Sequence, residues 1–271
     1  MTKEYRPLPL CIKNNITMKQ GRLTLWVMAA MASLVMTSCV AYRPQVAQLP
    51  LIHEKGELQV NGSIGLSAPL GDGYLGATAT YGATDWLAVQ GHVNWTGDKG
   101  AFGQASVGAY KAWKKAVLEG YVGYGFGGNR WESNSSDENT HIVISRFHLP
   151  FGQLNFGWAG LAKGHIDIGV GLKGGCIFPD IYDEKIYANS GQHQIRTNKD
   201  PIGLLEPQIF FRAGGKHLKW TLDVGYSQLW STSADKAVFS GTSAVYMPFT
   251  ITTGISYDFN VFSKKKSRNA E

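Results

Sequence analysis

The chain has little cysteine, little charge and, beyond its first 38 residues, no long apolar run. Its three cysteines among 271 residues are too few for a disulfide framework. Charged residues make up only 17% of the chain, and after Cys39 no apolar run reaches the roughly 20 residues that a membrane-spanning helix needs. If the chain crosses a membrane, it must therefore do so as a closed β-barrel, because open sheet edges cannot face lipid.

The basic excess of the whole chain belongs mostly to its first 38 residues. These hold five of the 26 Lys and Arg and one of the 20 Asp and Glu, so residues 39–271 carry 21 basic and 19 acidic side chains, a net charge of +2. A chain this close to neutrality shows no basic footprint for nucleic acid, and we expect no nucleic-acid partner.

An export signal precedes Cys39. Lys19 and Arg22 form a basic start, residues 23–36 form an apolar core, and the small residues Thr37 and Ser38 lead directly into the cysteine. A core of this length is too short to span a membrane as a helix and is typical of a signal peptide.

Residues 18–38 resemble the signal peptide of a bacterial lipoprotein. The resemblance implies that Cys39 is acylated, with a palmitate-type chain, and becomes the first residue of the mature protein. Cleavage near Ala41 as an ordinary signal peptide is the alternative, and it would discard Cys39. Residues 1–17 are expected to be an upstream extension of the reading frame, ahead of a start at Met18.

The remainder of the chain predicts an all-β protein, because it is rich in glycine and aromatic residues and shows alternation with a period of two. In the stretch "KWTLDVGYS", Trp220, Leu222 and Val224 fall on one face, and Lys219 and Asp223 fall on the other. Ten segments alternate in this way: residues 57–66, 74–82, 86–95, 102–111, 117–126, 141–159, 165–176, 206–214, 217–230 and 245–260. Most have about the 9 to 11 residues that a tilted strand needs to cross a bilayer.

The connections between these segments alternate between tight and long. Such asymmetry is typical of a closed antiparallel up-and-down transmembrane β-barrel, here with about ten strands. Eight or twelve strands are the alternatives, depending on how residues 141–159 and 177–205 are divided. Pro150 predicts either a bulge or a strand that runs beyond the membrane. We expect the barrel over residues 57–260, a periplasmic linker over 39–56 and a polar periplasmic tail over 261–271.

A soluble barrel would also alternate, but it would turn its apolar face inward. Two features favour the membrane barrel. Tyr and Trp cluster near the ends of the segments, as at membrane interfaces, and the polar face carries many charges, which suit a polar lumen. Those expected inside the barrel are Asp167, Lys173, Glu206, Arg212, Lys219, Asp223 and Asp258. We expect them to pair across neighbouring strands and to fill much of a narrow lumen.

The C-terminal stretch "TTGISYDF" resembles the last-strand signal read by the barrel-assembly machinery of the outer membrane. Thr252, Gly254, Tyr257 and Phe259 occupy its four positions. Together with "RFHLPFGQLNFGW" and "LEPQIFFRAGGKHLKWTLDVGYS", this stretch resembles outer-membrane barrel proteins and lipoproteins of Bacteroidota. That group has no agreed biochemical activity, so the resemblance implies a location and a fold. Because "VAYRPQ" after Cys39 carries no acidic residue, it also implies an anchor on the periplasmic leaflet.

The sequence offers little for catalysis or for cofactors. None of the seven histidines is followed by a serine two residues on. His141 and Ser145 would stand about 13 Å apart along a strand, too far for proton transfer. No histidine pair has the spacing of a metal site, and the lone Cys176 in "KGGCIF" is most simply a small residue in a strand. We therefore expect no enzyme, no metal and no cofactor.

The sequence thus predicts a non-enzymatic outer-membrane barrel lipoprotein with a structural or surface-interaction role. Its expected partners are outer-membrane lipid and lipopolysaccharide, the barrel-assembly machinery, and an unknown protein that contacts residues 127–140 and 177–205. We expect these two segments and residues 231–244 to be external loops. A narrow small-solute channel is one alternative. A soluble periplasmic barrel that binds a ligand inside is the other.

Overall fold

The structure is a computed structural model that describes residues 39–42, 49–68, 72–134, 140–187, 190–231, 244–246 and 248–260. The expected upstream extension, the signal peptide and the C-terminal tail lie outside these residues. Of the expected loop 231–244, only the two end residues are described.

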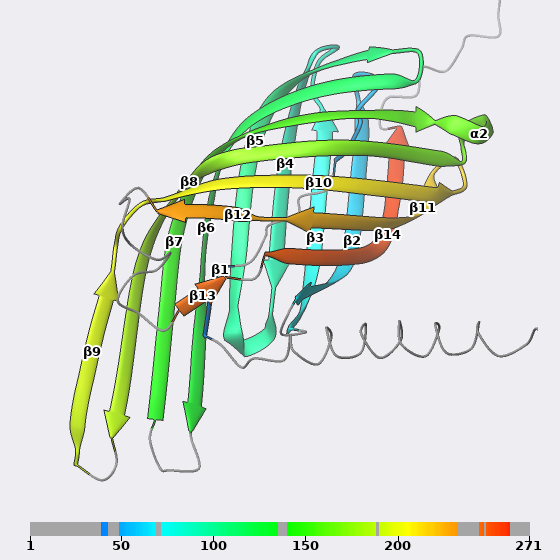
Figure 1. Cartoon of the computed structure of the whole chain (residues 1–271). Coiled ribbons are helices and arrows are strands. Elements are labelled where there is room, and N and C mark those ends of the chain that lie inside the picture. The colour runs from blue at the N-terminus through cyan, green and yellow to red at the C-terminus, as the bar shows by residue number, and fades with distance from the viewer. Residues whose placement is uncertain are drawn as a thin grey trace, which may run out of the picture. The chain divides into compact units, whose positions relative to one another are not determined.

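Ten antiparallel strands close into a barrel (Figure 1). They are β2 (Glu57–Ala68), β3 (Asp72–Gly82), β4 (Leu87–Trp95), β5 (Gly100–Trp113), β6 (Ala116–Asn134), β7 (Thr140–Gly160), β8 (Ile166–Tyr187), β10 (Ile202–Gly214), β11 (Leu218–Tyr226) and β14 (Phe249–Asn260). Each pairs with the next of these strands, β8 pairs directly with β10, and β14 returns to β2 along its whole length. The predicted fold class and the count of ten strands are confirmed.

Four short strands complete the sheet structure. β12 (Gln228–Ser231) continues β11 beyond Ser227 and pairs with the beginning of β10. β9 (Gln192–Asn198) forms a hairpin with the end of β8. β1 (Cys39–Tyr42) pairs in parallel with β13 (Ala244–Tyr246) in a separate two-stranded sheet.

The turns at one end of the barrel are tight, and we call this end the tight-turn end. There β5 passes to β6 through two residues, and β7 passes to β8 through the four-residue element α2 (Leu161–Gly164). Ala162 and Lys163 in α2 both have positive φ, so the element is a turn rather than a regular helix. The opposite end, which we call the loop end, carries the η1 turn (Gly97–Lys99) and the β8–β9 hairpin.

The side chains have the opposite arrangement to that of a soluble protein, which buries its apolar residues and exposes its polar ones. On β4, His92 is 3% exposed while its neighbour Val93 is 57% exposed, because successive side chains of a strand point to opposite faces. The same contrast runs around the barrel, with polar residues inside and large apolar residues outside. This is the pattern of a barrel that faces lipid with its outer surface and encloses a polar interior.

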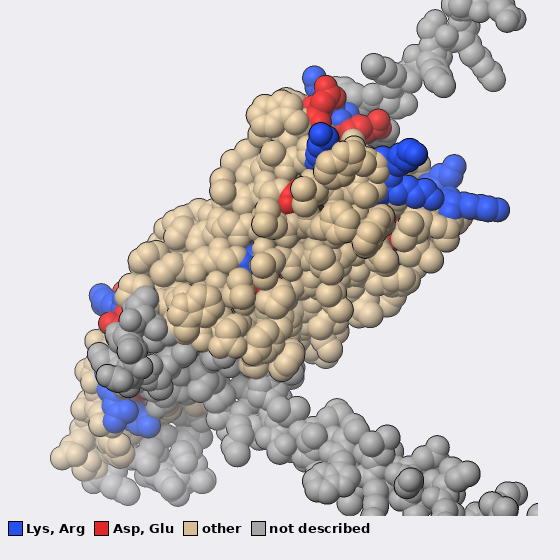
Figure 2. Space-filling model, turned by 45° about the horizontal axis from the view of Figure 1, so that its top comes forward, with Lys and Arg blue, Asp and Glu red and all other residues tan. Residues whose placement is uncertain are grey.

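Charged and aromatic side chains mark the edges of the apolar outer surface. On the face shown in Figure 2, Lys, Arg, Asp and Glu gather at two opposite ends, and a broad zone between them is almost free of charge. Exposed tryptophans lie near strand ends: Trp86, Trp113 and Trp158 towards the tight turns, Trp95 and Trp230 towards the loops. Such aromatic girdles are typical of membrane interfaces.

Two of the expected loops are largely strand. β6 runs to Asn134 and β7 begins at Thr140, so most of 127–140 is paired; β8, β9 and β10 likewise occupy most of 177–205. β7 has 21 residues and β8 has 22, about twice what a bilayer crossing requires. We call this projecting part of β6, β7, β8 and β9 the extension. In residues 177–187 of β8 each face carries both apolar and polar side chains, such as Ile181 and Asp183 on the buried face, so this stretch lacks the apolar alternation that reveals a strand in sequence.

The extension also settles the two alternatives for Pro150. β6 and β7 stay in one register from Ala116 and Trp158 to Asn134 and Thr140, with Pro150 opposite Tyr124. The strand therefore continues past the proline without a bulge against β6 and runs on beyond the length of a membrane crossing. Cys176 lies in β8 as a free cysteine, as expected for a small strand residue.

Candidate functional site

The lumen of the barrel is the candidate functional site, because its polar and charged side chains are gathered there. The structure places six of the seven expected lumen charges among the buried residues, and Asp258 is partly buried. Six of them fall into two groups, one near the tight-turn end and one farther along the barrel, and Asp223 lies apart.

Asp167 is the centre of the first group. Its carboxylate accepts hydrogen bonds from the Lys219 Nζ at 2.7 and 2.9 Å and from the Gly160 backbone N–H at 2.8 Å. The Arg212 guanidinium lies 3.8 Å from the same carboxylate, and Lys219 also lies 3.9 Å from Asp258. Asp167 and Arg212 stand directly opposite each other on β8 and β10, so pairing across neighbouring strands brings these charges together.

Glu206 is the centre of the second group. It stands opposite Lys173 in the β8–β10 register, with 3.4 Å between the Lys173 Nζ and the Glu206 Oε2. The hydroxyls of Tyr42 and Ser227 both donate to its Oε1. Lys173 reaches across the lumen and donates to the Gln104 Oε1 at 3.2 Å. The group therefore ties β8 and β10 to the opposite wall.

Asp223 lies apart from both groups. It is directly opposite Thr252 on β14, and the Thr252 hydroxyl donates to its Oδ2 at 3.2 Å. Buried charges of this kind are strongly destabilising when one partner is lost, although an intact pair contributes little net stability over an apolar pair.

Sequence reasoning missed the segment that fills the space between these walls. Residues 39–56 were expected to be a linker on the periplasmic side, but Tyr42 and residues 49–52 are buried against inward-facing residues of the barrel. The Arg212 guanidinium donates to the backbone carbonyls of Leu49 and Pro50, and the Glu119 Oε1 accepts from the Ile52 N–H at 2.8 Å. One sequence signal was present, the apolar stretch "LPLI" directly before the polar residues "HEK".

The four residues of the expected assembly signal lie on β14, which closes the barrel against β2. Thr252 points inward and is buried, whereas Tyr257 and Phe259 are exposed on the outer face with their rings 4.3 Å apart. Gly254 faces β2 so closely that an added Cβ would collide with the Gly62 carbonyl. A larger residue at 254 would therefore disturb the seam between the first and last barrel strands.

His141 and Ser145, the two residues considered for catalysis, both lie on β7, and Ser145 is buried. His141 Nε2 lies 2.7 Å from the Asp183 Oδ1, and its ring packs edge-on against Trp131. In the part of the chain that the structure describes, no three or more His, Cys, Asp and Glu side chains gather in a way that could hold a metal ion.

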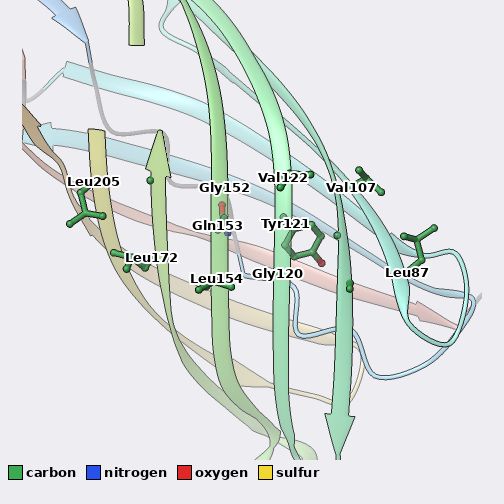
Figure 3. Close-up of a pocket in the computed structure, with 13 residues that line it drawn as sticks. Leu87, Val107, Gly120, Tyr121, Val122, Gly152, Gln153, Leu154, Leu172 and Leu205 are labelled. Carbon is green, nitrogen blue, oxygen red and sulfur yellow. The ribbon is translucent and has the colours of Figure 1, made fainter. Parts of the chain in front are cut away.

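A hollow of about 640 Å³ lies on the outside of the barrel wall (Figure 3). Leu154, Leu172 and Val122 contribute exposed apolar side chains, while Gly120 and Gly152 leave room between them. No charged side chain lines it. On a surface that faces lipid, a hollow of this chemistry suits acyl chains rather than a polar ligand.

Comparisons with known proteins bear on the fold alone. No family model matches this chain, and no curated protein matches it. Among solved structures, the outer membrane protease OmpT from Escherichia coli matches with a TM-score of 0.52 and 9% identity over 75% of this chain and 94% of its own. The translocator domain of autotransporter NalP from Neisseria meningitidis has a TM-score of 0.35 and 12% identity over 90% and 97%.

The chain therefore has the fold of an outer-membrane β-barrel protein. At 9% identity, the likeness to a protease says nothing of catalysis here. No helix among the described residues is long and apolar enough to cross a membrane.

Proposed function

We propose that this protein is a non-enzymatic β-barrel of the bacterial outer membrane, with a lipid-modified N-terminus at Cys39 and an interaction role carried by the extension. The observation that supports the location best is the outward apolar surface between two charged ends (Figure 2). A soluble ligand-binding barrel would place these apolar side chains inside. The lumen contents count against the alternative of an open solute channel, because charge pairs and residues 49–52 occupy it.

The extension supports the interaction role. β9 ends the order of strands in its sheet, and no strand of the described chain pairs with its outer edge. Residues 192–197 of β9 are exposed, and Ile195 adds an apolar side chain among them. An open edge of this kind can accept an extended segment of a partner by adding one more strand. We therefore propose that the protein partner expected from the sequence binds the open edge of β9 and not an irregular loop.

The other expected partners follow from the same surface. Lipid, including lipopolysaccharide, would contact the apolar belt, and the barrel-assembly machinery would contact β14 through Thr252, Gly254, Tyr257 and Phe259.

The experiment that tests the location is the gel mobility of protein from outer-membrane fractions, with and without boiling in detergent. A closed barrel that resists detergent migrates differently before boiling. Mobility that does not change, together with recovery of a Cys39→Ser variant in the soluble fraction, would overturn the membrane assignment. For the interaction role, an Ile195→Pro variant removes one backbone N–H from β9 and should lose a partner that binds this edge.

A further inference from the structure

The described pieces of the N-terminal segment occupy two different levels of the barrel lumen. Residues 49–52 pack near the tight-turn end, against Val117 and Ala159, which are close to the ends of their strands at the tight turns. Tyr42 packs near the loop end, with Phe102 and Phe147. From Tyr42 to Ile52 there are ten residues, which cover about 33 Å as extended chain. That reach matches a passage along the lumen.

The wall of the barrel is shaped to receive residues 49–52. Gly171 and Gly157 point inward where Leu49 and Leu51 press on the wall, and an added Cβ would come within 2.7 Å of the Leu49 side chain and 2.8 Å of the Leu51 side chain. Leu51 itself adopts a left-handed backbone conformation, with φ of 56°. Leu49, Leu51 and Ile52 are all almost completely buried.

Polar groups of the wall satisfy the backbone of the same residues. The Arg212 guanidinium donates to the carbonyls of Leu49 and Pro50, and Glu119 accepts from the N–H of Ile52. Arg212 and Glu119 lie on β10 and β6, so they hold the segment from two walls. Buried charged groups require such partners, and here the N-terminal segment provides them.

Tyr42, in the other described piece of the segment, is also held both by packing against the wall and by a hydrogen bond to a charged side chain. The Tyr42 ring stacks edge-on against Phe147 with 5.4 Å between centroids, and its hydroxyl donates to Glu206 at 2.9 Å. The backbone of β1 pairs with β13, which precedes the loop-end start of β14 by a few residues. Figure 1 shows β1 and β13 towards the end from which the β8–β9 hairpin projects, away from α2.

We propose that residues 39–42 and 49–52 are a resident plug of the lumen, which keeps a ten-stranded pore closed. The plug places Cys39 at the loop end, and so on the external side and not on the periplasmic leaflet expected from the sequence. Eight strands enclose a space that side chains alone can fill, and ten enclose more, which this plug occupies. At the tight-turn end a cavity of about 390 Å³, rimmed by Lys114, Lys115 and Lys216, has Pro50 and Leu51 among its lining residues. The plug thus lies where a solute would enter. This inference goes beyond the proposed function, because it concerns the lumen and not the extension.

The experiment is single-channel recording in planar bilayers of the mature chain and of a chain that begins at residue 53. The mature chain should be electrically closed. The shortened chain should give stepwise currents, and a synthetic peptide of residues 39–52, with serine at position 39, should suppress them. The same peptide with Tyr42→Ala and Leu51→Gly should suppress them less.

A point variant provides a second test that does not remove any residue. Gly171→Val introduces a side chain where Leu49 and the Gln208 side chain now lie, so it should displace the plug and open the pore. Gly91→Val is the matched control, because an added Cβ there meets nothing within 4 Å and the residue faces outward. Its mature chain should stay closed.

Heat-dependent gel mobility establishes that each variant forms the barrel. A folded shortened chain that stays closed would overturn the proposal, and so would a mature chain that already conducts. If the shortened chain does not fold, the Gly171→Val variant tests the proposal instead. A Gly171→Val chain that folds but stays closed would also overturn the proposal. Neither result affects the proposed membrane location, because the mobility shift tests the location separately.

Discussion

Lys219 and Asp167 form a buried ion pair in the lumen, with the lysine Nζ 2.7 and 2.9 Å from the two carboxylate oxygens. The pair joins β11 to β8 across the intervening β10, on which Arg212 approaches the same carboxylate. Two cations therefore share one carboxylate inside a barrel whose outer surface is apolar. This arrangement leads to the first prediction.

Asp167→Asn should destabilise the barrel strongly. It leaves Lys219 and Arg212 without their shared counter-charge, and breaking a buried ion pair costs about 3–5 kcal/mol. The free energy of unfolding in urea, measured in detergent or liposomes, should fall by that amount. Asp180→Asn is the control, because Asp180 and its partner Lys199, 3.4 Å away, are both exposed and such a pair contributes about 0–1 kcal/mol. Equal effects of the two substitutions would show that water screens the ion pair of Asp167 as fully as it screens the exposed pair of Asp180.

Lysine on the outer wall should be costly only where lipid covers it. Val122 in the middle of the apolar belt is 65% exposed and Ile195 on β9 is 54% exposed, so the two sites are matched in exposure. Val122→Lys should cost about 2–4 kcal/mol in a bilayer, the range for a lysine near the midplane, whereas Ile195→Lys in the extension should be nearly neutral. Folding free energies in liposomes measure both. Neutral behaviour at both sites would contradict the position of the belt.

The pairing of β1 with β13 should be detectable by cross-linking. Val40 is the register partner of Val245, so in a Cys176→Ala background the double variant Val40→Cys and Val245→Cys should form a disulfide. Attachment of a polymer-linked maleimide, with and without prior reduction, reports it. Val40→Cys with Val122→Cys on the outer wall should form none. A cross-link in the control and not in the test pair would place β1 elsewhere.

The same register tests the modification of Cys39. Its partner is Ala244, so Ala244→Cys should cross-link to Cys39 in protein made without a lipoprotein-processing system. In protein from bacterial outer membranes the disulfide should be absent, because an acylated thioether cannot form it. A cross-link in that material as well would show that the sulfur of Cys39 is free and that the lipoprotein assignment is wrong.

The hairpin of the extension should respond to pH through Glu184 and His193. The hydrogen bond from the His193 ring, at 2.8 Å, lowers the pKa of the Glu184 carboxyl. A carboxyl with a lowered pKa in the folded state contributes stability above its unfolded pKa and loses it as pH falls through the folded pKa. His193→Ala should raise the pKa of Glu184, measured by carboxyl carbon NMR. An unchanged titration would mean that this bond does not form in solution.

Much of the fold followed from local pattern. In residues 218–227 apolar and polar side chains alternate, and residues 249–260 do so nearly throughout. One face of each strand meets lipid and the other meets the lumen, and this difference between the faces is visible in the sequence. The inward position of Asp167, Lys173 and Glu206 follows from the same period of two.

Two features depend on tertiary contacts and could not be predicted from the sequence: the strands of the extension and the position of residues 49–52 in the lumen. In residues 177–187 of β8 the buried face carries both Ile181 and Asp183, and the outer face carries Phe178 beside Asp180. No regular alternation therefore distinguishes this stretch from a loop, and only its pairing with β7 and β9 defines it as a strand. Residues 49–52 show no strand pattern either. They lie in the lumen, where Gly157 and Gly171 leave space for Leu51 and Leu49 and where Arg212 and Glu119 form hydrogen bonds with their backbone.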